Sequence, residues 1–366
     1  MQVKQLVYER FRNLQDGTFE PYEGVNVITG ENAQGKTNLL EAVWLFTGGK
    51  SFRGAKDREL VGFDAEDSRL TLDFFAAGRD QRAVIDIKQR RTAQLNGIAQ
   101  SSAAKLAGVL CGVVFSPAHL SLIKGGPAER RHLMDAAYCQ LRPSYVKTLT
   151  EYTRILTQRN ALCKSGDMSA GASELFDLWD KQLAQAGCLL IYARQLYLKS
   201  MLPKARQIYH GLSGGKEEFD LRYVSTVPIA DGQTAGEIAA TMYQELRIRR
   251  KDDLAAGFTT VGPHRDDLEV LIDGHSARQY GSQGQQRSAV LAMKLAEATL
   301  LKDVTGERPI ALLDDVMSEL DTTRQDYILN HIRDWQVFIT CCDPTPLLRL
   351  TDGRCFTMKN GVLSTN

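Results

Sequence analysis

Three short strings in the chain carry the residue types that bind phosphate groups and divalent metal ions. The string GENAQGKT covers Gly30–Thr37, a glycine-rich segment that ends in lysine and threonine. The string SQGQQ begins at Ser282, and two adjacent carboxylates, Asp314 and Asp315, follow the apolar run PIALL. Lysine and backbone N–H groups bind phosphate oxygens, whereas threonine and aspartate oxygens suit Mg²⁺. The strings therefore predict a site for a nucleoside triphosphate and its metal ion.

The glycine-rich string fits the phosphate-loop pattern G-x-x-x-x-G-K-[ST] in the context that the pattern needs. An apolar run at 25–28 precedes it and a helix is expected at 38–46, so backbone N–H groups would surround phosphate at a helix N-terminus. Lys36 is expected to reach the β- and γ-phosphates, and Thr37 to hold Mg²⁺. The predicted nucleotide-binding residues of this loop are Gly30, Glu31, Asn32, Ala33, Gln34, Gly35, Lys36 and Thr37.

The two aspartates follow an apolar run, 309–313, that is typical of a fully buried strand. An acidic side chain at the carboxyl end of a strand beside a phosphate loop is placed to bind Mg²⁺. We assign Asp314 to the metal, directly or through water, and Asp315 to polarising the attacking water. The alternative for Asp315 is a carboxylate that only orients Asp314. The predicted catalytic residues are Asp315, Lys36 and Asp314, and the predicted metal ligands are Thr37 and Asp314.

The string SQGQQ lies just before an expected helix at 287–302, which has apolar side chains at helical spacing. The N-terminus of that helix offers a second site for an anion. We therefore add Ser282, Gly284 and Gln285 to the predicted nucleotide-binding residues.

This set of strings resembles the heads of ABC-type ATPases, and among them the SMC-like branch. The resemblance implies an α/β fold, an ABC-type head with a mixed β core and a helical lobe inserted between the phosphate loop and the signature string. It also implies that two heads close on ATP, with Ser282 and Gly284 acting on the nucleotide of the other subunit. The segment Ser318–Asp321 corresponds to the D-loop of such heads.

Length narrows the resemblance further. Only 245 residues separate Thr37 from Ser282 (282 minus 37), which is too short for coiled-coil arms, and no heptad repeat is sustained there. The strings FRNL, VVFSP, GGPAERRHLMD and GPHRDD are similar to those of the RecF family, which are armless bacterial recombination mediators. The resemblance implies slow, DNA-stimulated ATP hydrolysis with ATP and Mg²⁺ as cofactors. It implies binding of double-stranded and gapped DNA, ATP-dependent homodimers, and partnership with RecR, RecO and, indirectly, RecA in gap repair and the SOS response.

The pattern of strand-like and helix-like segments along the chain predicts three parts. Residues 1–120, rich in short strands, form the N-terminal part of the ATPase lobe with the phosphate loop, and Asn96-Gly97 is a hairpin signal. Residues 121–255 are helix-rich, with apolar spacing such as Leu175, Leu178 and Leu183, a break at 211–215 and a short strand at 219–224. Residues 256–366 form the C-terminal part of the ATPase.

Composition suits an intracellular protein. The seven cysteines are irregularly spaced, which predicts reduced thiols in a cytoplasmic protein. The chain has no signal-peptide pattern and no apolar run of membrane-spanning length, so no membrane association is expected.

Bulk charge does not indicate nucleic acid, because 45 Lys and Arg face 44 Asp and Glu, so any DNA-binding surface must be local. Lys and Arg neutralise phosphates without reading sequence. Positions 247, 250 and 251 would share one face of a helix. The alternative is a solvated or salt-bridged surface, and for 130–131 a structural or nucleotide-sensing pair. The basic candidates for DNA contact are Arg53, Lys56, Arg130, Arg131, Arg247, Arg250 and Lys251, with Arg58 and Arg249 nearby.

Some positions depart from the general ABC pattern. Asp315 stands where a glutamate is usual, and Thr340 where a switch histidine is usual, which predicts slow hydrolysis. The glutamine expected after Phe115 is absent, leaving Ser116 or His119 in its place. In SMC-like heads a basic side chain after the first strand approaches the nucleotide, and Arg12 and Asn13 hold that position here.

Two other classes of protein share parts of this pattern. A transporter ATPase subunit would usually have that glutamine and the switch histidine. A regulatory scaffold would bind ATP as a switch with negligible turnover.

Overall fold

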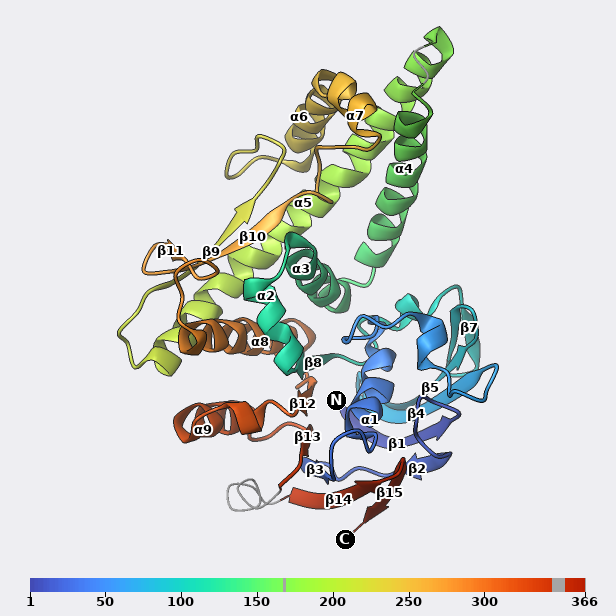
Figure 1. Ribbon diagram of the computed structural model, residues 1–366, viewed down its shortest axis with the longest axis vertical. Coiled ribbons are helices and arrows are strands. Elements are labelled where there is room, and N and C mark those ends of the chain that lie inside the picture. The colour runs from blue at the N-terminus through green and yellow to red at the C-terminus, as the bar shows by residue number, and fades with distance from the viewer. Residues whose placement is uncertain (167–168, 344–352, 366) are drawn as a thin grey trace. The chain divides into compact units, whose positions relative to one another are not determined.

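The computed structural model describes residues 1–166, 169–343 and 353–365, which divide into two compact units. The first unit, residues 1–120, 207–216 and 287–366, holds most of the strands. The second, residues 121–206 and 217–286, is mostly helical (Figure 1). Residues 256–286, which we expected in the C-terminal part of the ATPase, therefore belong to the helical unit. Within the described residues, no helix is both long and apolar enough to cross a membrane.

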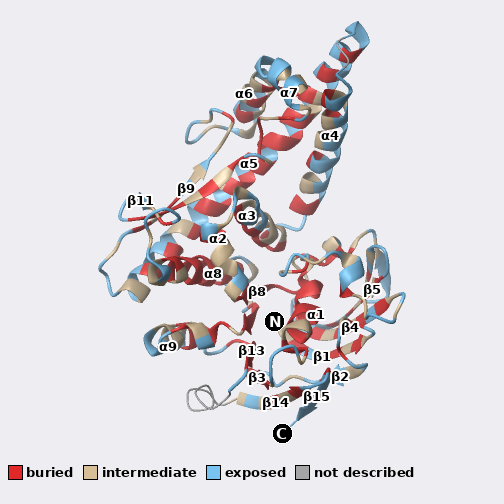
Figure 2. Ribbon diagram, in the orientation of Figure 1, coloured by how far each residue is buried: buried red, intermediate tan, exposed pale blue. Residues whose placement is uncertain are grey.

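A six-stranded sheet in the first unit brings together strand ends that are far apart in the sequence. Its order is β15-β14-β3-β13-β12-β8, and every neighbouring pair is parallel except β14 and β15. Each residue of β3, β12 and β13 is buried, as expected for strands covered on both faces (Figure 2). The bounds are β3 Val25–Thr29, β8 Gly112–Phe115, β12 Ile310–Asp314, β13 Val337–Cys341, β14 Gly353–Lys359 and β15 Val362–Thr365.

A second, antiparallel sheet of the first unit has the order β2-β1-β4-β5-β6-β7. The predicted hairpin is confirmed: Leu95 pairs with Ile98, and the turn residues Asn96 and Gly97 have φ values of 50° and 79°, as a type I′ turn requires. Phe19 at its edge packs edge-on against Phe338 of the parallel sheet. The bounds are β1 Gln2–Glu9, β2 Gly17–Phe19, β4 Ser68–Ala76, β5 Arg79–Ile87, β6 Arg91–Leu95 and β7 Ile98–Gln100.

Helices α1 (Lys36–Trp44) and α9 (Thr322–His331) belong to the first unit, and helix α8 spans Gln283–Thr305. We expected α8 to begin at Arg287, after the string SQGQQ, and this was wrong. Ser282 and Gln285 form a capping box: the Ser282 N–H donates to Gln285 Oε1 at 2.7 Å, and the Gln285 N–H donates to Ser282 Oγ at 3.2 Å. This cap starts the helix four residues early, so the string forms its first turn.

The second unit is built on helix α5 (Ala170–Ser213) and the small sheet β11-β10-β9. Helix α5 buries Leu183, but Leu175 and Leu178, which we cited as part of the same apolar face, are 47% and 48% exposed. The predicted break at 211–215 begins only after Ser213, because α5 continues through Gly211. The other bounds are α2 Ser121–Lys124, α3 Pro127–Leu141, α4 Tyr145–Ser165, α6 Ala235–Ile248, α7 Arg250–Ala256, β9 Phe219–Val224, β10 Asp267–Ile272 and β11 His275–Ser276.

Buried charges organise the second unit. The guanidinium of Arg159 is fully buried and donates to Asp180 at 2.6 Å and to Asp253 at 2.7 Å. An arginine that we considered for DNA contact is also used here: Arg130 pairs with Asp267 at 2.7 Å and is 4% exposed. Removing one partner of such a pair would leave an uncompensated buried charge, so a substitution at either partner is expected to be strongly destabilising.

Acidification is expected to destabilise the second unit through His264. Its Nδ1 lies 2.7 Å from the Tyr152 hydroxyl and its Nε2 lies 3.0 Å from the Thr259 carbonyl oxygen, and burial lowers the pKa of the imidazole to about 4. The unfolded chain binds a proton near pH 6.5. Stability is therefore complete above about pH 6.5 and falls as the pH drops towards about 4.

The expected loss is about 2 kcal/mol between pH 7 and pH 5. Urea unfolding at both pH values should show a smaller loss for His264→Gln than for the wild type. His210→Gln serves as the control and should behave as the wild type. An identical pH dependence in His264→Gln and the wild type would contradict the assignment.

Candidate functional site

The loop Gly30–Thr37 has a backbone that only its own glycines permit. Gly30 and Gly35 have φ values of 149° and 114°, in the region that favours glycine. A Cβ atom on Gly30 would lie 2.3 Å from the carbonyl oxygen of Met358, so no side chain fits there. The loop follows β3 directly and leads into α1, which confirms the predicted strand–loop–helix context.

Lys36 lies across the loop. Its side chain is 6% exposed, and its Nζ donates to the carbonyl oxygens of Gly30 at 2.5 Å and Glu31 at 2.8 Å. The Sγ atom of Cys342, after β13, lies 3.8 Å from the same Nζ. The ammonium is thus held beside the loop's N–H groups, where phosphate oxygens bind in loops of this pattern.

The carboxylate of Asp314 connects the loop to the sheet. Its Oδ1 accepts from the hydroxyls of Thr37 at 2.7 Å and Thr340 at 2.9 Å. Thr340 is the register partner of Asp314 on β13, which explains why it reaches this carboxylate. Burial raises the pKa of Asp314, and the two hydroxyls act in the opposite direction.

Asp315 begins the turn after β12 in a left-handed conformation, with φ of 52°. Its N–H donates to Thr340 Oγ1 at 2.9 Å, and its carbonyl oxygen accepts from the Ser318 hydroxyl at 2.9 Å. A non-glycine residue at such a φ persists only where its surroundings fix it, and this is frequent at functional sites. Asp315 also lines the pocket described next, whereas Asp314 lies beneath it.

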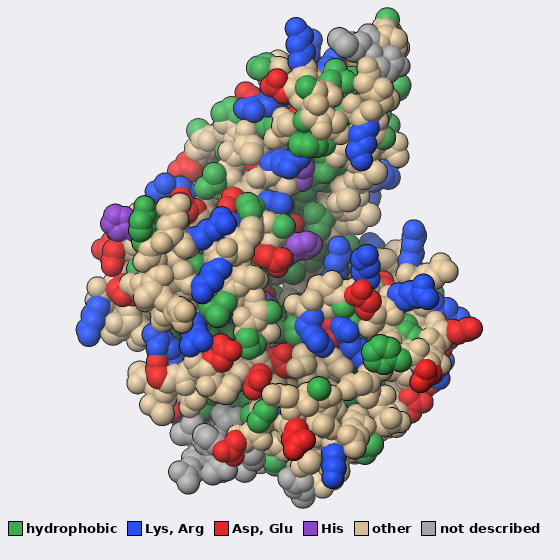
Figure 3. All heavy atoms as spheres, viewed as in Figure 1, with side chains coloured by type: hydrophobic (Ala, Val, Ile, Leu, Met, Phe, Trp, Pro, Cys, Tyr) green, Lys and Arg blue, Asp and Glu red, His purple; other side chains and the backbone are tan. Residues whose placement is uncertain are grey.

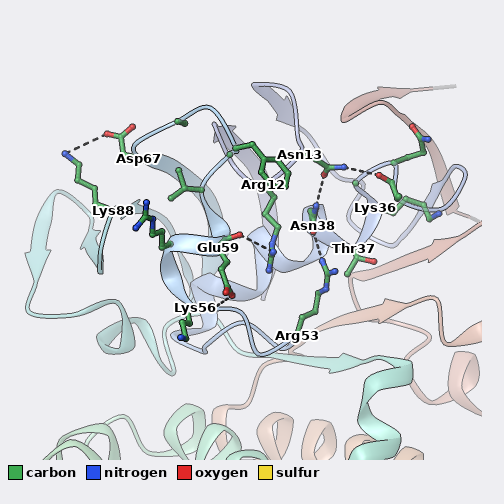
Figure 4. Close-up of a pocket in the computed structure, with 18 of the residues that line it drawn as sticks. Arg12, Asn13, Lys36, Thr37, Asn38, Arg53, Lys56, Glu59, Asp67 and Lys88 are labelled. Carbon is green, nitrogen blue, oxygen red and sulfur yellow. Dashed lines mark hydrogen bonds and ion pairs between the residues drawn. The ribbon is translucent and has the colours of Figure 1, made fainter.

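A pocket of about 1680 Å³ opens over the loop (Figure 4). Arg12 lines it and is held by Glu41 Oε2 at 2.6 Å, with one buried guanidinium nitrogen left without a hydrogen-bond partner among the described residues. Asn13 Nδ2 donates to the Ala33 carbonyl oxygen at 3.0 Å and so connects the first strand to the loop.

The residues present fit a nucleoside triphosphate with Mg²⁺. The loop supplies N–H groups, Lys36 supplies a cation, and the free nitrogen of Arg12 supplies a donor without a partner among the described residues. Mg²⁺ is usually bound by one or two protein oxygens together with phosphates and water, and Thr37 and Asp314 offer such a pair. The described residues contain no group of three or more His, Cys, Asp or Glu side chains placed to bind a metal without help from a ligand.

The structure also places the residues that were expected at the glutamine position and in the signature string. Ser116 is buried at the end of β8, and its N–H donates to His119 Nδ1 at 3.3 Å. Burial lowers the pKa of His119 to about 3, so this imidazole is neutral and acts as a local hydrogen-bond acceptor. Ser282 and Gly284 lie in the second unit, at the start of α8, where the Ser282 side chain is exposed.

The DNA candidates separate into paired and unpaired cations. Arg250 pairs with Asp177 and Asp180 at 2.7 Å, and Arg131 donates to the Asp266 carbonyl oxygen at 2.7 Å. The expectation that 247, 250 and 251 share one helix face was wrong, because α6 ends at Ile248 and α7 begins at Arg250. The exposed candidates are Arg53, Lys56, Arg247 and Lys251.

Sequence reasoning missed the contact between Thr340 and Asp314, because it identified Thr340 only by the histidine that is absent there. It also missed Cys342 at the loop. The register of β13 against β12 determines the first contact and its register against β3 the second, and register is not visible in a single sequence.

Known proteins are similar to this chain in sequence. The family described as RecF/RecN/SMC N terminal domain matches residues 2–359. The DNA replication and repair protein RecF of Heliobacterium modesticaldum is 42% identical over 347 residues, covering 93% of this chain and 92% of that protein. The RecF protein of Clostridium kluyveri is 36% identical over 368 residues and is covered completely, as is this chain.

Solved structures of related proteins are similar to this structure. The structure of the recombination mediator protein RecF with ATP in the RecFOR pathway superimposes with a TM-score of 0.93 at 34% identity, covering 100% of this chain and 97% of the other. An Smc head domain from Pyrococcus furiosus, at 14% identity and a TM-score of 0.55, shares the fold. The predicted fold class, an ABC-type, SMC-like head, is thereby confirmed. The chain belongs to the RecF family of DNA replication and repair proteins, within the SMC-like ATPases.

Proposed function

We propose that the chain is an ATP-switched DNA clamp of gap repair. It binds ATP and Mg²⁺, dimerises on ATP, holds duplex or gapped DNA without reading sequence, and hydrolyses ATP slowly. In the cytoplasm it helps RecO and RecR to load RecA in gap repair and the SOS response. The observation that carries this proposal is the hydrogen bond of 2.7 Å from Thr37 to Asp314, which joins the phosphate loop to the acidic strand end.

The phosphate loop binds and orients the triphosphate. Lys36 is positioned to exchange its bonds with Gly30 and Glu31 for phosphate oxygens. Thr37 and Asp314 would hold Mg²⁺, which neutralises charge on the β- and γ-phosphates when bound. Apart from the Lys36 ammonium, these groups are fixed by the fold before ATP arrives, so little reorganisation is needed.

Asp315 is the candidate to accept the proton of the attacking water. It lines the pocket and is held by Thr340 and Ser318. No imidazole stands at position 340 to assist it, and an aspartate reaches less far than a glutamate. Both features support slow turnover, which suits a timed switch better than a motor.

Dimerisation is assigned to the start of α8. Ser282 is exposed and caps the helix, so its hydroxyl and the helix N-terminus can meet the γ-phosphate held by a second copy. Neither copy of the chain then supplies all the phosphate ligands of its own site. ATP therefore joins the two copies.

DNA contact is assigned to exposed cations that form no ion pair within the described residues. Arg53, Lys56, Arg247 and Lys251 are exposed, whereas the ion pairs of Arg130, with Asp267, and of Arg250 favour a structural role for them. Contacts of this kind give affinity without sequence preference.

Replacing Lys36 by alanine is expected to lower ATP turnover about 100-fold or more, because a charge that stabilises the transferred phosphate is lost. Steady-state phosphate release measures this. Lys302→Ala, on an exposed part of α8, is the matched control and should retain wild-type turnover. Wild-type turnover in Lys36→Ala would rule out the loop as the catalytic site.

Asp315→Asn should retain ATP-dependent dimerisation and lose about 100-fold in turnover, since a general base contributes about 10²–10⁴-fold. Sedimentation and single-turnover hydrolysis on the same sample test both parts. Undiminished turnover would restrict Asp315 to orienting Asp314. Negligible turnover in the wild type itself would favour a binding switch that does not use hydrolysis.

Ser282→Arg is expected to bind ATP as a monomer and to fail to dimerise, because the larger side chain blocks contact with the partner's phosphate. Analytical ultracentrifugation with and without ATP shows the result. Ser276→Arg, in β11 of the same unit, controls for added charge. A normal ATP-dependent dimer of Ser282→Arg would refute the contact between subunits.

A further inference from the structure

The pocket over the phosphate loop is larger than one nucleotide needs. Its volume of about 1680 Å³ exceeds the range of about 300–1,000 Å³ that is typical of small-molecule sites. A second pocket of about 460 Å³ shares Asp67, Lys88 and Arg90 with it. In Figure 4, Lys88 and Asp67 lie at the opposite end of the drawn site from Lys36 and Thr37. The space therefore continues well beyond the triphosphate.

This outer part carries cations that form no short ion pair with any described residue, while Glu59, Glu66 and Asp67 line the same pocket. Arg58 and Arg90 are exposed and form no ion pair within the described residues, and Lys88 has only a contact of 3.8 Å with Asp67. Figure 3 shows several Lys and Arg side chains, with Asp and Glu side chains among them, on the visible surface of the first unit near β5 and β7. Unpaired cations that line a concave surface attract a polyanion.

An ion pair between their chain neighbours holds Arg58 and Arg90 at the same pocket. Asp57 and Arg91 form an ion pair at 2.7 Å, and the Arg91 N–H also donates to Asp57 Oδ2 at 3.1 Å. Arg58 and Arg90 are the chain neighbours of this pair. The pair therefore ties the 3-10 turn Asp57–Leu60 to the turn between β5 and β6 and brings both guanidinium groups to the same pocket.

An aromatic side chain lines the same pocket. Phe63 lines the first pocket and is 97% exposed. An exposed ring beside unpaired cations is the combination that proteins use to bind unpaired nucleic acid, because phosphates meet the cations and a base stacks on the ring. A stacked base uses the whole face of the ring while its phosphates meet the cations, so the ring and the cations together favour nucleic acid.

We infer that this outer trough, formed by Arg58, Lys88, Arg90 and Phe63, binds a nucleic-acid strand beside the ATP site. Phosphates of the strand contact the three cations, and an unpaired base at a gap stacks on Phe63. The inference rests on the proposed function and names a surface for its DNA. It places the strand on the unit that binds ATP, so nucleotide and DNA occupy adjoining parts of one pocket.

The test measures DNA binding by fluorescence anisotropy with ATP, over a range of salt, for Arg58→Gln/Arg90→Gln. The slope of log K against log salt should fall by about two, because each arginine that is removed leaves about one phosphate without its cation. The control Lys105→Gln/Lys302→Gln removes two exposed cations outside the trough and should leave the slope unchanged. ATP affinity, measured without DNA by titration with a fluorescent ATP analogue, should change less than about twofold in both, because neither pair contacts the triphosphate.

A second variant tests the ring. Phe63→Ala should lower affinity for a gapped duplex at least about fivefold, since stacking contributes about 1–3 kcal/mol per base, and leave a continuous duplex unaffected. An unchanged salt slope in the double variant, with DNA still bound, would overturn the trough but not the proposed function. Loss of ATP affinity alone would show that the rim serves the nucleotide. A wild-type protein that binds no DNA would instead refute the proposed function.

Discussion

The hydrogen bond between Thr37 and Asp314 joins residues 277 positions apart, and the site depends on it. It forms only because β3, β13 and β12 are parallel neighbours whose carboxyl ends meet at one edge. Each strand is buried along its whole length, so a shift of register would displace hydrophobic side chains as well as the carboxylate. Hydrophobic packing thus fixes the position of a polar contact.

Hydrogen bonds at the same edge favour the charged form of the buried Asp314 carboxylate, which is the form that binds a metal ion. Burial raises the pKa of Asp314 and favours its neutral form, while the hydroxyls of Thr37 and Thr340 favour the charged form. The same Thr340 hydroxyl accepts from the N–H of Asp315, whose φ is 52°. One threonine therefore orients both carboxylates, at the place where other ABC-type heads carry a histidine.

Much of this could be predicted from the sequence, and the reasons are physical. The phosphate loop, the strand before Asp314 and the Asn96-Gly97 hairpin are encoded locally, so short strings reveal them. The start of α8 was misplaced because the Ser282 cap outweighs the glycine that follows it. The outer cations were not recognised as one surface, because the ion pair between Asp57 and Arg91 that brings them together spans 34 residues.

In the proposed mechanism, ATP controls how tightly the protein binds DNA. The most direct measurement is the affinity for one gapped duplex with no nucleotide, with ATP in the Asp315→Asn variant to prevent turnover, and with ADP. Tight DNA binding is expected in the state with ATP and in neither of the other two, and, by reciprocity, ATP should bind more tightly when DNA is present. Equal DNA affinity in all three states would contradict it.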